Sequence, residues 1–150
     1  PQYAERILHY LPEFENQFHL FAVPALRALP HMDSTYVSRV RSMAEIHLKR
    51  SAETTSRNPY GVMITEGGWA GNGAVIGGAI TNYYLHKAFP DLFETEDVLR
   101  GVNYILGTHP ASNLSFVSGV GARSKIVAYG MNRADFSFIA GGIVPGVLML

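Results

Sequence analysis

The chain has no cysteine and little charge: only 16% of its 150 residues are charged. The absence of cysteine excludes disulfides, thiol nucleophiles and thiolate zinc sites. Twelve basic and twelve acidic residues cancel, seven against seven in residues 1–75 and five against five in residues 76–150. Without a basic tail or stripe to release counterions, we expect no nucleic-acid partner. No uninterrupted apolar run reaches ~18 residues, so we expect no membrane span.

What the chain does have is apolar bulk, with 47% hydrophobic residues and 15 glycines. This content is too apolar for a disordered chain and predicts a single domain over residues 1–150. The sequence begins at Pro1 without an initiator Met and ends on an uncharged apolar run, residues 147–150. Because chain ends are usually polar and solvated, we expect this domain to be a fragment of a longer polypeptide.

Two helices are predicted in the middle of the chain. Apolar residues follow i, i+3, i+4, i+7 spacing over residues 35–53, after Asp33 and Ser34 as candidate N-caps. A second helix is predicted over residues 73–89, with Asn72 as its cap. Apolar residues surround most of this second helix, and we therefore expect it to be buried on most sides.

Further helices are predicted on both sides of this pair. A third helix over residues 95–106 has acidic residues in its first turn and ends at Gly107, a suitable C′ residue. The N-terminal third predicts two short helices, one interrupted by Pro12 and one that ends near Pro24.

Two long irregular segments, residues 54–72 and 108–137, are rich in Gly, Asn, Ser, Thr and Pro. Connections of that length are uncommon in compact domains and are usually functional. Alternation of helices with long glycine-rich loops is typical of a helical scaffold that displays a site at one end. We therefore expect residues 58–72 and 108–137 to lie at the same end of the helices.

The candidate binding residues lie in these two loops. Trp69 is the only tryptophan, and it serves either as a stacking platform for a flat ring such as a sugar or as a plug over the core. Tyr129, Asn132 and Arg133 place hydrogen-bonding groups beside an aromatic ring, which suits a neutral polyol. Arg133 holds either a substrate group or an ion pair with Asp135, two residues further on.

Other chemistries find little support in the sequence. No two of the six histidines have the i, i+4 spacing with an adjacent Glu that a helical zinc protease needs, so we expect no metal site and no cofactor. Glu66 and Asp135 are loop carboxylates without a visible partner, and turn or capping roles suit them better than acid–base catalysis. The glycine-rich stretch 67–73 lacks the Lys-Ser/Thr pair of a phosphate-binding loop.

A series of loop motifs adds a family resemblance. The motifs are Asn-Pro-Tyr-Gly-Val at 58–62 with Gly-Trp-Ala-Gly-Asn at 68–72, Asn-Tyr-Ile-Leu-Gly-Thr-His-Pro at 103–110, Phe-Val-Ser-Gly-Val-Gly at 116–121 and Ile-Ala-Gly-Gly-Ile-Val-Pro-Gly at 139–146. In order and spacing they resemble glycoside hydrolase family nine, the endoglucanase-type cellulases, over residues 34–150.

The resemblance implies an all-α fold, a section of an (α/α) toroid of six helical hairpins with long Gly-rich loops at one end. It implies part of a catalytic domain for inverting hydrolysis of β-glycosidic bonds in a polysaccharide or oligosaccharide. This chain would supply substrate-binding loops, through Trp69, Tyr129, Asn132, Arg133 and Asp135. The expected partners are a carbohydrate substrate and either the remainder of the same polypeptide or a second copy. The expected location is secreted or periplasmic.

The chain also departs from the family pattern. The family's base lies in an early Asp-Ala-Gly-Asp motif and its acid is a Glu beyond the last motif, and neither is present here. Inverting chemistry needs both carboxylates, ~6.5–9.5 Å apart. We therefore assign no catalytic residue and expect the isolated chain to be inactive unless Asp135 or Glu66 substitutes.

A second departure concerns the substrate. Arg133 matches the arginine of the family's His-His-Arg motif, but both histidines are absent. Their absence points to a divergent branch, exo-acting on a different glucan or an amino sugar. The alternative is a non-catalytic helical domain with degenerate loops that binds carbohydrate or another protein.

Overall fold

A computed structural model describes residues 6, 9–10, 17–64, 71–109, 112–125 and 139–145. These residues form four α-helices, one short 3-10 helix and no strand. The helices are α2 (Phe18–Ala28), η2 (Leu29–His31), α3 (Ser34–Ser56), α4 (Gly71–Ala88) and α5 (Thr95–Ile105). For this part of the chain the predicted all-α class is confirmed. No helix in these ranges is long and apolar enough to cross a membrane.

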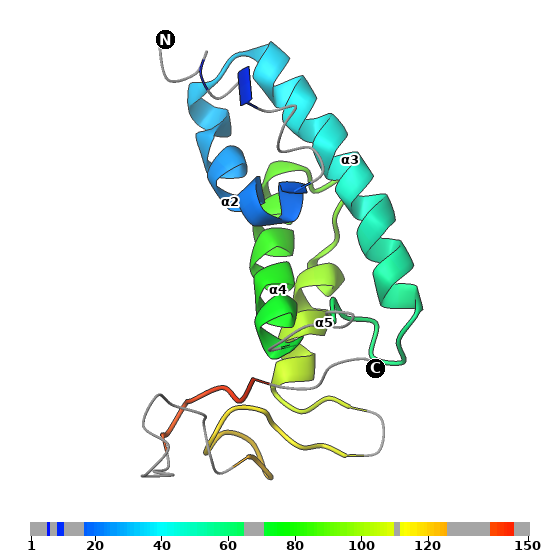
Figure 1. Ribbon diagram of the computed structural model, residues 1–150, viewed down its shortest axis with the longest axis vertical. Coiled ribbons are helices and arrows are strands. Elements are labelled where there is room, and N and C mark those ends of the chain that lie inside the picture. Colours follow the sequence, from blue (N-terminus) through cyan, green and yellow to red (C-terminus); the bar gives the residue numbers. More distant parts are fainter. Residues whose placement is uncertain are drawn as a thin grey trace.

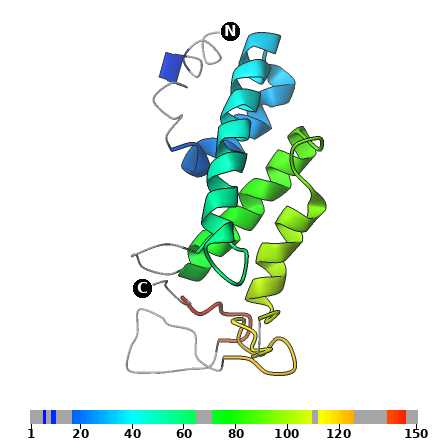
Figure 2. The same ribbon diagram turned by 90° about the vertical axis from the view of Figure 1, so that its right-hand side faces the viewer.

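The longest helix, α3, runs along one side of the molecule, and α4 and α5 form a hairpin beside it (Figure 1). The side view shows the two hairpin helices lying next to each other over most of their length (Figure 2). Helix α2 packs against α3 and against the last turns of α4.

Two hydrophobic clusters hold this arrangement together. The first joins α2, α3 and the end of α4, and Tyr36 at its centre is fully buried while its hydroxyl donates a 3.0 Å hydrogen bond to the Ala25 carbonyl. Burial raises the pKa of the Tyr36 hydroxyl. The second joins α4 and α5 to the loops, and its buried members are Val62, Ile64, Val75, Tyr104, Ile105 and Phe116. The second cluster therefore supports the segments that carry the family-like motifs.

Helix α3 confirms its predicted start and corrects its predicted end. The Asp33 carboxylate accepts a 2.9 Å hydrogen bond from the Tyr36 amide, as expected of an N-cap. The helix continues to Ser56, three residues beyond the predicted end at residue 53. Hydroxyl side chains in its last turns donate to the helix's own carbonyls, namely Ser51, Thr54, Thr55 and Ser56. These bonds satisfy the hydroxyl groups within the helix, so the polar sequence at its end does not require a loop.

Three other predictions need correction. The helix predicted to end near Pro24 continues to Ala28, so Pro24 lies inside α2. Ala22 and Leu26, on either side of Pro24, are buried in one cluster, and their packing outweighs the hydrogen bond lost at the proline. Asn72 lies in the first turn of α4 and is buried there; it does not cap the helix. Helix α4 is not buried on most sides, since Ile80 is 49% exposed.

Of the helix predicted before Pro12, the structure describes residues 6, 9 and 10, which are helical; Pro12 itself lies outside the described residues. Helix α5 ends as predicted, with Gly107 in the left-handed region at φ +105°.

His47 gives the fold a dependence on pH. Its ring lies partly buried on α3, with its centroid 5.8 Å from that of the Phe18 ring. Burial, together with the positive charges of His19 and Arg50, lowers its pKa from 6.5 to about 4. Between these two values the unfolded chain binds a proton that the folded chain does not, so stability rises with pH across this interval.

We predict that the free energy of unfolding falls by about 2 kcal/mol between pH 7 and pH 5 through this residue. His47→Gln removes the titrating group. In urea titrations at pH 7 and pH 5, the free energy of unfolding of this variant should therefore fall by about 2 kcal/mol less than that of the wild type. Equal pH dependence in both proteins would contradict the assignment.

Candidate functional site

The described parts of both long loops lie at the same end of the helices. Residues 57–64 follow α3, residues 112–125 follow α5, and both segments lie at the end where α4 begins (Figure 1). The Tyr60 ring of the first loop contacts Tyr104, which in turn contacts Phe116 of the second loop, with ring centroids 5.3 Å and 5.4 Å apart. The prediction of a common end is confirmed for these parts. The first irregular segment is shorter than predicted, because α3 extends to Ser56 and α4 already begins at Gly71.

The first loop is organised by Asn58, which is buried at its start. Its Oδ1 accepts hydrogen bonds from the amides of Tyr60 (3.1 Å) and Val62 (3.4 Å). Its Nδ2 donates to the carbonyls of Thr54 (3.2 Å) and Val62 (2.9 Å). The turn also requires Gly61, whose φ is +61°. The Pro-Tyr-Gly-Val motif is therefore a tight turn held by the asparagine that precedes it.

The second loop is tied to the end of α5 by backbone hydrogen bonds. The Phe116 amide donates to the Ile105 carbonyl over 2.9 Å, and the Phe116 carbonyl accepts from Val144 over 3.0 Å. The Ser118 amide donates to the Gly142 carbonyl over 2.9 Å. This extended stretch makes isolated β-bridges but no named strand. Two of the family-like motifs, at 116–121 and 139–146, thus meet over their described residues.

Asn72 joins this arrangement to the start of α4. Its amide donates to the Pro145 carbonyl and its side-chain Nδ2 donates to the Val144 carbonyl, both over 2.9 Å. The residue is 1% exposed, so both bonds are shielded from water. In place of capping its helix, Asn72 holds the last described segment against it.

A cluster of four rings lies where the loops meet, formed by Tyr60, Tyr104, His109 and Phe116. The His109 Nε2 lies 2.6 Å from the Tyr104 carbonyl, which can only accept, so we assign the proton to Nε2. The His109 Nδ1 then accepts from the Ser112 hydroxyl at 3.0 Å. His109 thereby links the end of α5 to the start of the second loop. The cluster was not predicted from the sequence, although all four of its members lie inside the quoted motifs at 58–62, 103–110 and 116–121.

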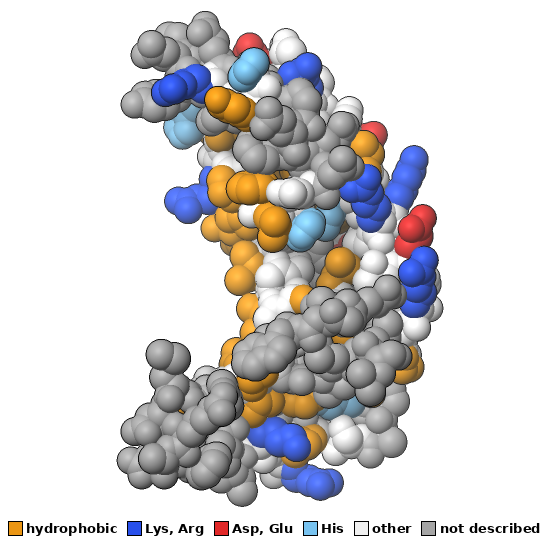
Figure 3. All heavy atoms as spheres, in the orientation of Figure 1, with side chains coloured by type: hydrophobic (Ala, Val, Ile, Leu, Met, Phe, Trp, Pro, Cys, Tyr) orange, Lys and Arg blue, Asp and Glu red, His pale blue; other side chains and the backbone are white. Residues whose placement is uncertain are grey.

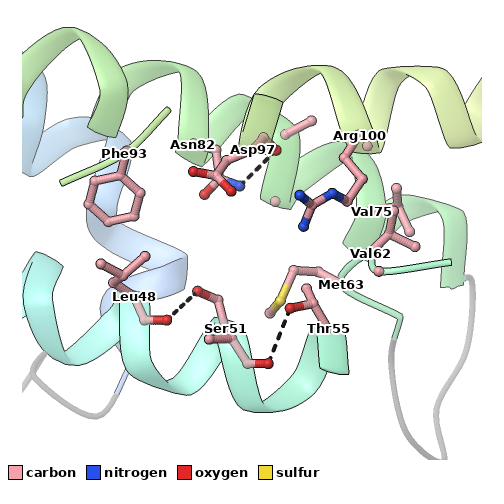
Figure 4. A pocket seen from close by; sticks show the side chains of 15 residues that line it. Leu48, Ser51, Thr55, Val62, Met63, Val75, Asn82, Phe93, Asp97 and Arg100 are labelled. Atoms are coloured by element: carbon pink, nitrogen blue, oxygen red, sulfur yellow. Dashed lines mark hydrogen bonds between the residues drawn. The ribbon is translucent and has the colours of Figure 1, made fainter. Parts of the chain in front are cut away.

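A cleft of about 140 Å³ opens between α3, α4, α5 and the first loop (Figure 4). Ser51 and Thr55 line it from α3, and each donates its hydroxyl to its own helix, leaving oxygen lone pairs for a ligand. Asn82 donates its Nδ2 to the Asp97 carbonyl over 3.1 Å, which leaves its Oδ1 as an acceptor.

Arg100 supplies donors to the same cleft. Figure 4 shows its guanidinium reaching from α5 toward Met63 and α3. It makes no hydrogen bond or ion pair with the residues that the structure describes. A Cβ added at Gly61 would lie 3.2 Å from the Arg100 Cδ, so the glycine makes room for this side chain. The Arg100 donors face hydroxyl and amide acceptors across the cleft, and this arrangement can hold a small polyhydroxyl group. Among the described lining residues Asp97 is the one carboxylate, whereas paired acid and base catalysis needs two.

The sequence-predicted site residues all lie outside the described residues: Trp69, Tyr129, Asn132, Arg133 and Asp135. The same holds for Glu66. Within the described ranges no group of three or more His, Asp or Glu side chains could hold a metal ion.

Comparisons with known proteins add no relative. No protein-family model, no curated protein and no solved structure matches the chain.

The approach of the second loop to α5 can be tested at Gly107. A Cβ there would lie 2.8 Å from the Ser115 amide nitrogen, and the φ of +105° disfavours any other residue. We predict that Gly107→Ala lowers the free energy of unfolding by at least about 2 kcal/mol in a urea titration.

The control is Gly77→Ala, because Gly77 lies inside α4 with no atom within 4 Å of an added Cβ. It should raise the free energy of unfolding by about 0.5–1 kcal/mol. Equal effects of the two alanines would show that Gly107 is not needed for the close approach.

Proposed function

We propose that the chain is part of the catalytic domain of a glycoside hydrolase that hydrolyses β-glycosidic bonds in a polysaccharide or oligosaccharide with inversion at the anomeric carbon, and that it supplies substrate-binding loops. One observation carries the proposal. The described parts of the four family-like motifs, which are far apart in the sequence, converge at one end of a helical scaffold. A cleft at the end of a helical toroid is the architecture that the resemblance implies.

The proposed roles follow from side-chain chemistry. Trp69 stacks on a sugar ring, which offers a flat apolar face. Arg133 grips two adjacent oxygens with its fork of donors, and Tyr129 and Asn132 bind further hydroxyls. Asp135 accepts from a hydroxyl or orients Arg133.

The acid and the base of the reaction come, in this proposal, from other parts of a longer polypeptide. Within the described residues the cleft of Figure 4 offers only the Asp97 carboxylate, and inversion needs two. The chain would then be one section of a six-hairpin toroid, secreted or periplasmic like its polysaccharide substrate, and inactive alone.

The same observation favours one alternative, a non-catalytic helical domain that binds carbohydrate or another protein. Flanking sequence separates the two proposals. An Asp-Ala-Gly-Asp motif upstream and an Asn-Glu downstream favour the enzyme, and their absence favours the binding domain.

Sugar binding can be measured on the chain itself, because Trp69 is its only tryptophan. We predict that β-linked oligosaccharides of glucose or glucosamine change the tryptophan emission in a saturable way. Arg133→Ala should raise the dissociation constant at least tenfold, about 1.4 kcal/mol, while the control Lys49→Ala on α3 should leave it unchanged. No saturable change with any of these sugars would contradict the proposal.

A longer polypeptide that contains both carboxylate motifs tests catalysis. There Arg133→Ala should cut kcat/KM roughly tenfold to a hundredfold, the loss of about 1.4–2.8 kcal/mol of transition-state binding, with a nearly unchanged Tm. Unchanged kinetics with a lowered Tm would assign Arg133 to the scaffold.

A further inference from the structure

Charged side chains are few in this molecule, at 16% of the sequence. In Figure 3 apolar side chains gather along the hollowed edge over α2 and α4, and several charged ones lie on the opposite side over α3. The cleft of Figure 4 differs from both surfaces, because its described lining holds one anion and one cation among apolar and neutral polar groups. Asp97 and Arg100 supply these two charges.

Asp97 and Arg100 line the cleft without pairing with each other. Both residues come from α5 and lie three positions apart, a spacing at which an aspartate and an arginine ordinarily attract each other on a helix surface. No ion pair joins the two in the part of the chain that the structure describes. Both charges are therefore available to a ligand in the cleft.

Each of the two charged groups is directed elsewhere by its own surroundings. One oxygen of the Asp97 carboxylate accepts a 3.0 Å hydrogen bond from the Glu94 amide, which completes a capping box at the start of α5. The Arg100 guanidinium reaches toward Met63 and α3, through the space that Gly61 leaves. A carboxylate can accept about four hydrogen bonds on its two oxygens, so the capping bond leaves Asp97 further acceptor capacity.

The polar groups of the cleft are arranged with acceptors near Asp97 and charged donors at Arg100. The Asn82 side chain lies beside Asp97, because its Nδ2 donates to the Asp97 carbonyl, and its Oδ1 stays an acceptor. Ser51 and Thr55 on the facing wall donate their hydroxyl protons to their own helix and can therefore only accept from a ligand. Figure 4 shows the Arg100 guanidinium further along α5, apart from the Asn82–Asp97 contact. The cleft thus suits a ligand with several donors and one anionic end.

The cleft has room for a small molecule only. Its volume of about 140 Å³ is close to that of the ~150 Å³ protein cavity that holds benzene, so a ligand of roughly six to eight non-hydrogen atoms fits. A whole sugar ring with its hydroxyls is much larger. Leu48, Val75 and Phe93 contribute apolar surface to the lining. The occupant is therefore a compact molecule with two charged ends and a small remaining part.

We propose that the cleft between α3, α4 and α5 binds a free α-amino acid with a small side chain, such as L-alanine or L-serine. The carboxylate of the ligand accepts from the Arg100 guanidinium, whose planar fork of donors matches a carboxylate. The ammonium donates to the Asp97 carboxylate and to the Asn82 oxygen. A ligand that carries both charges pairs both side chains at once. The inference does not depend on the proposed sugar chemistry.

NMR titration of the ¹⁵N-labelled 150-residue chain with L-alanine and with L-serine tests the site. We expect saturable shifts, largest at the amides of Gly78 and Gly101 in the cleft wall, and a dissociation constant below about 1 mM. Arg100→Gln keeps a polar side chain but loses the charge and the fork, and should raise the dissociation constant roughly tenfold or more. The control is Arg27→Gln on α2, which contributes no residue to the cleft, and it should leave the dissociation constant unchanged.

A second measurement changes the ligand, so its outcome does not depend on whether a variant folds. L-Lactate carries a hydroxyl where L-alanine carries its ammonium, and ethylamine lacks the carboxylate. Each should bind the wild type roughly tenfold more weakly than L-alanine, or weaker still. Asp97→Asn keeps an acceptor for the Glu94 amide but loses the charge, and should remove most of the preference for L-alanine over L-lactate.

Four outcomes would overturn the proposal. The first is the absence of saturable shifts with both amino acids, and the second is an affinity that Arg100→Gln does not change. The third is equal affinity for L-alanine and L-lactate, which would show that the cleft reads a carboxylate alone. The fourth is tighter binding of glucose than of L-alanine in the same titration, which would assign the cleft to the sugar chemistry proposed above.

Discussion

The loop end of the molecule depends on one close approach between backbones, at Gly107. Only a residue without a Cβ can take the φ of +105° there and let the Ser115 amide come so near. That approach places Phe116 against the Ile105 carbonyl, and Phe116 in turn binds Val144. Asn72 then fastens Val144 to the start of α4. These contacts form a continuous series from Gly107 to the start of α4, which holds the second loop and the last described segment against the helix ends.

Periodicity predicted α3, α4 and α5 because each carries an apolar stripe at helical spacing. It failed at Pro24, where burial of the neighbouring residues overrides local preference, and at Ser56, where the hydroxyl finds its acceptor within the same helix. It also failed for α4, because an apolar stripe does not say whether another part of the same chain covers it. Ile80 and Tyr83 belong to such an uncovered stripe.

The candidate site was accessible to sequence reasoning only as a set of motifs. The motifs placed Tyr60, Tyr104, His109 and Phe116 in separate segments, and the ring cluster arises only when helices α3 to α5 bring those segments together. Arg100 could not be identified as a site residue from the sequence, since there it is a single charge on a surface helix. Its place in the cleft depends on the space left by Gly61 in a distant turn. Trp69 and Arg133 lie outside the described residues, so their roles stay predictions.

We infer from these hydrogen bonds that the loop segments dock as one unit on the helix ends. Native-state hydrogen exchange measures this most directly, through the donor amides of Asn72, Phe116, Ser118 and Val144. We predict that these four amides open together, with one shared free energy and with protection comparable to that of α5. Exchange of Phe116, Ser118 and Val144 at the rates of an unstructured peptide, while the amides of α5 stay protected, would contradict it.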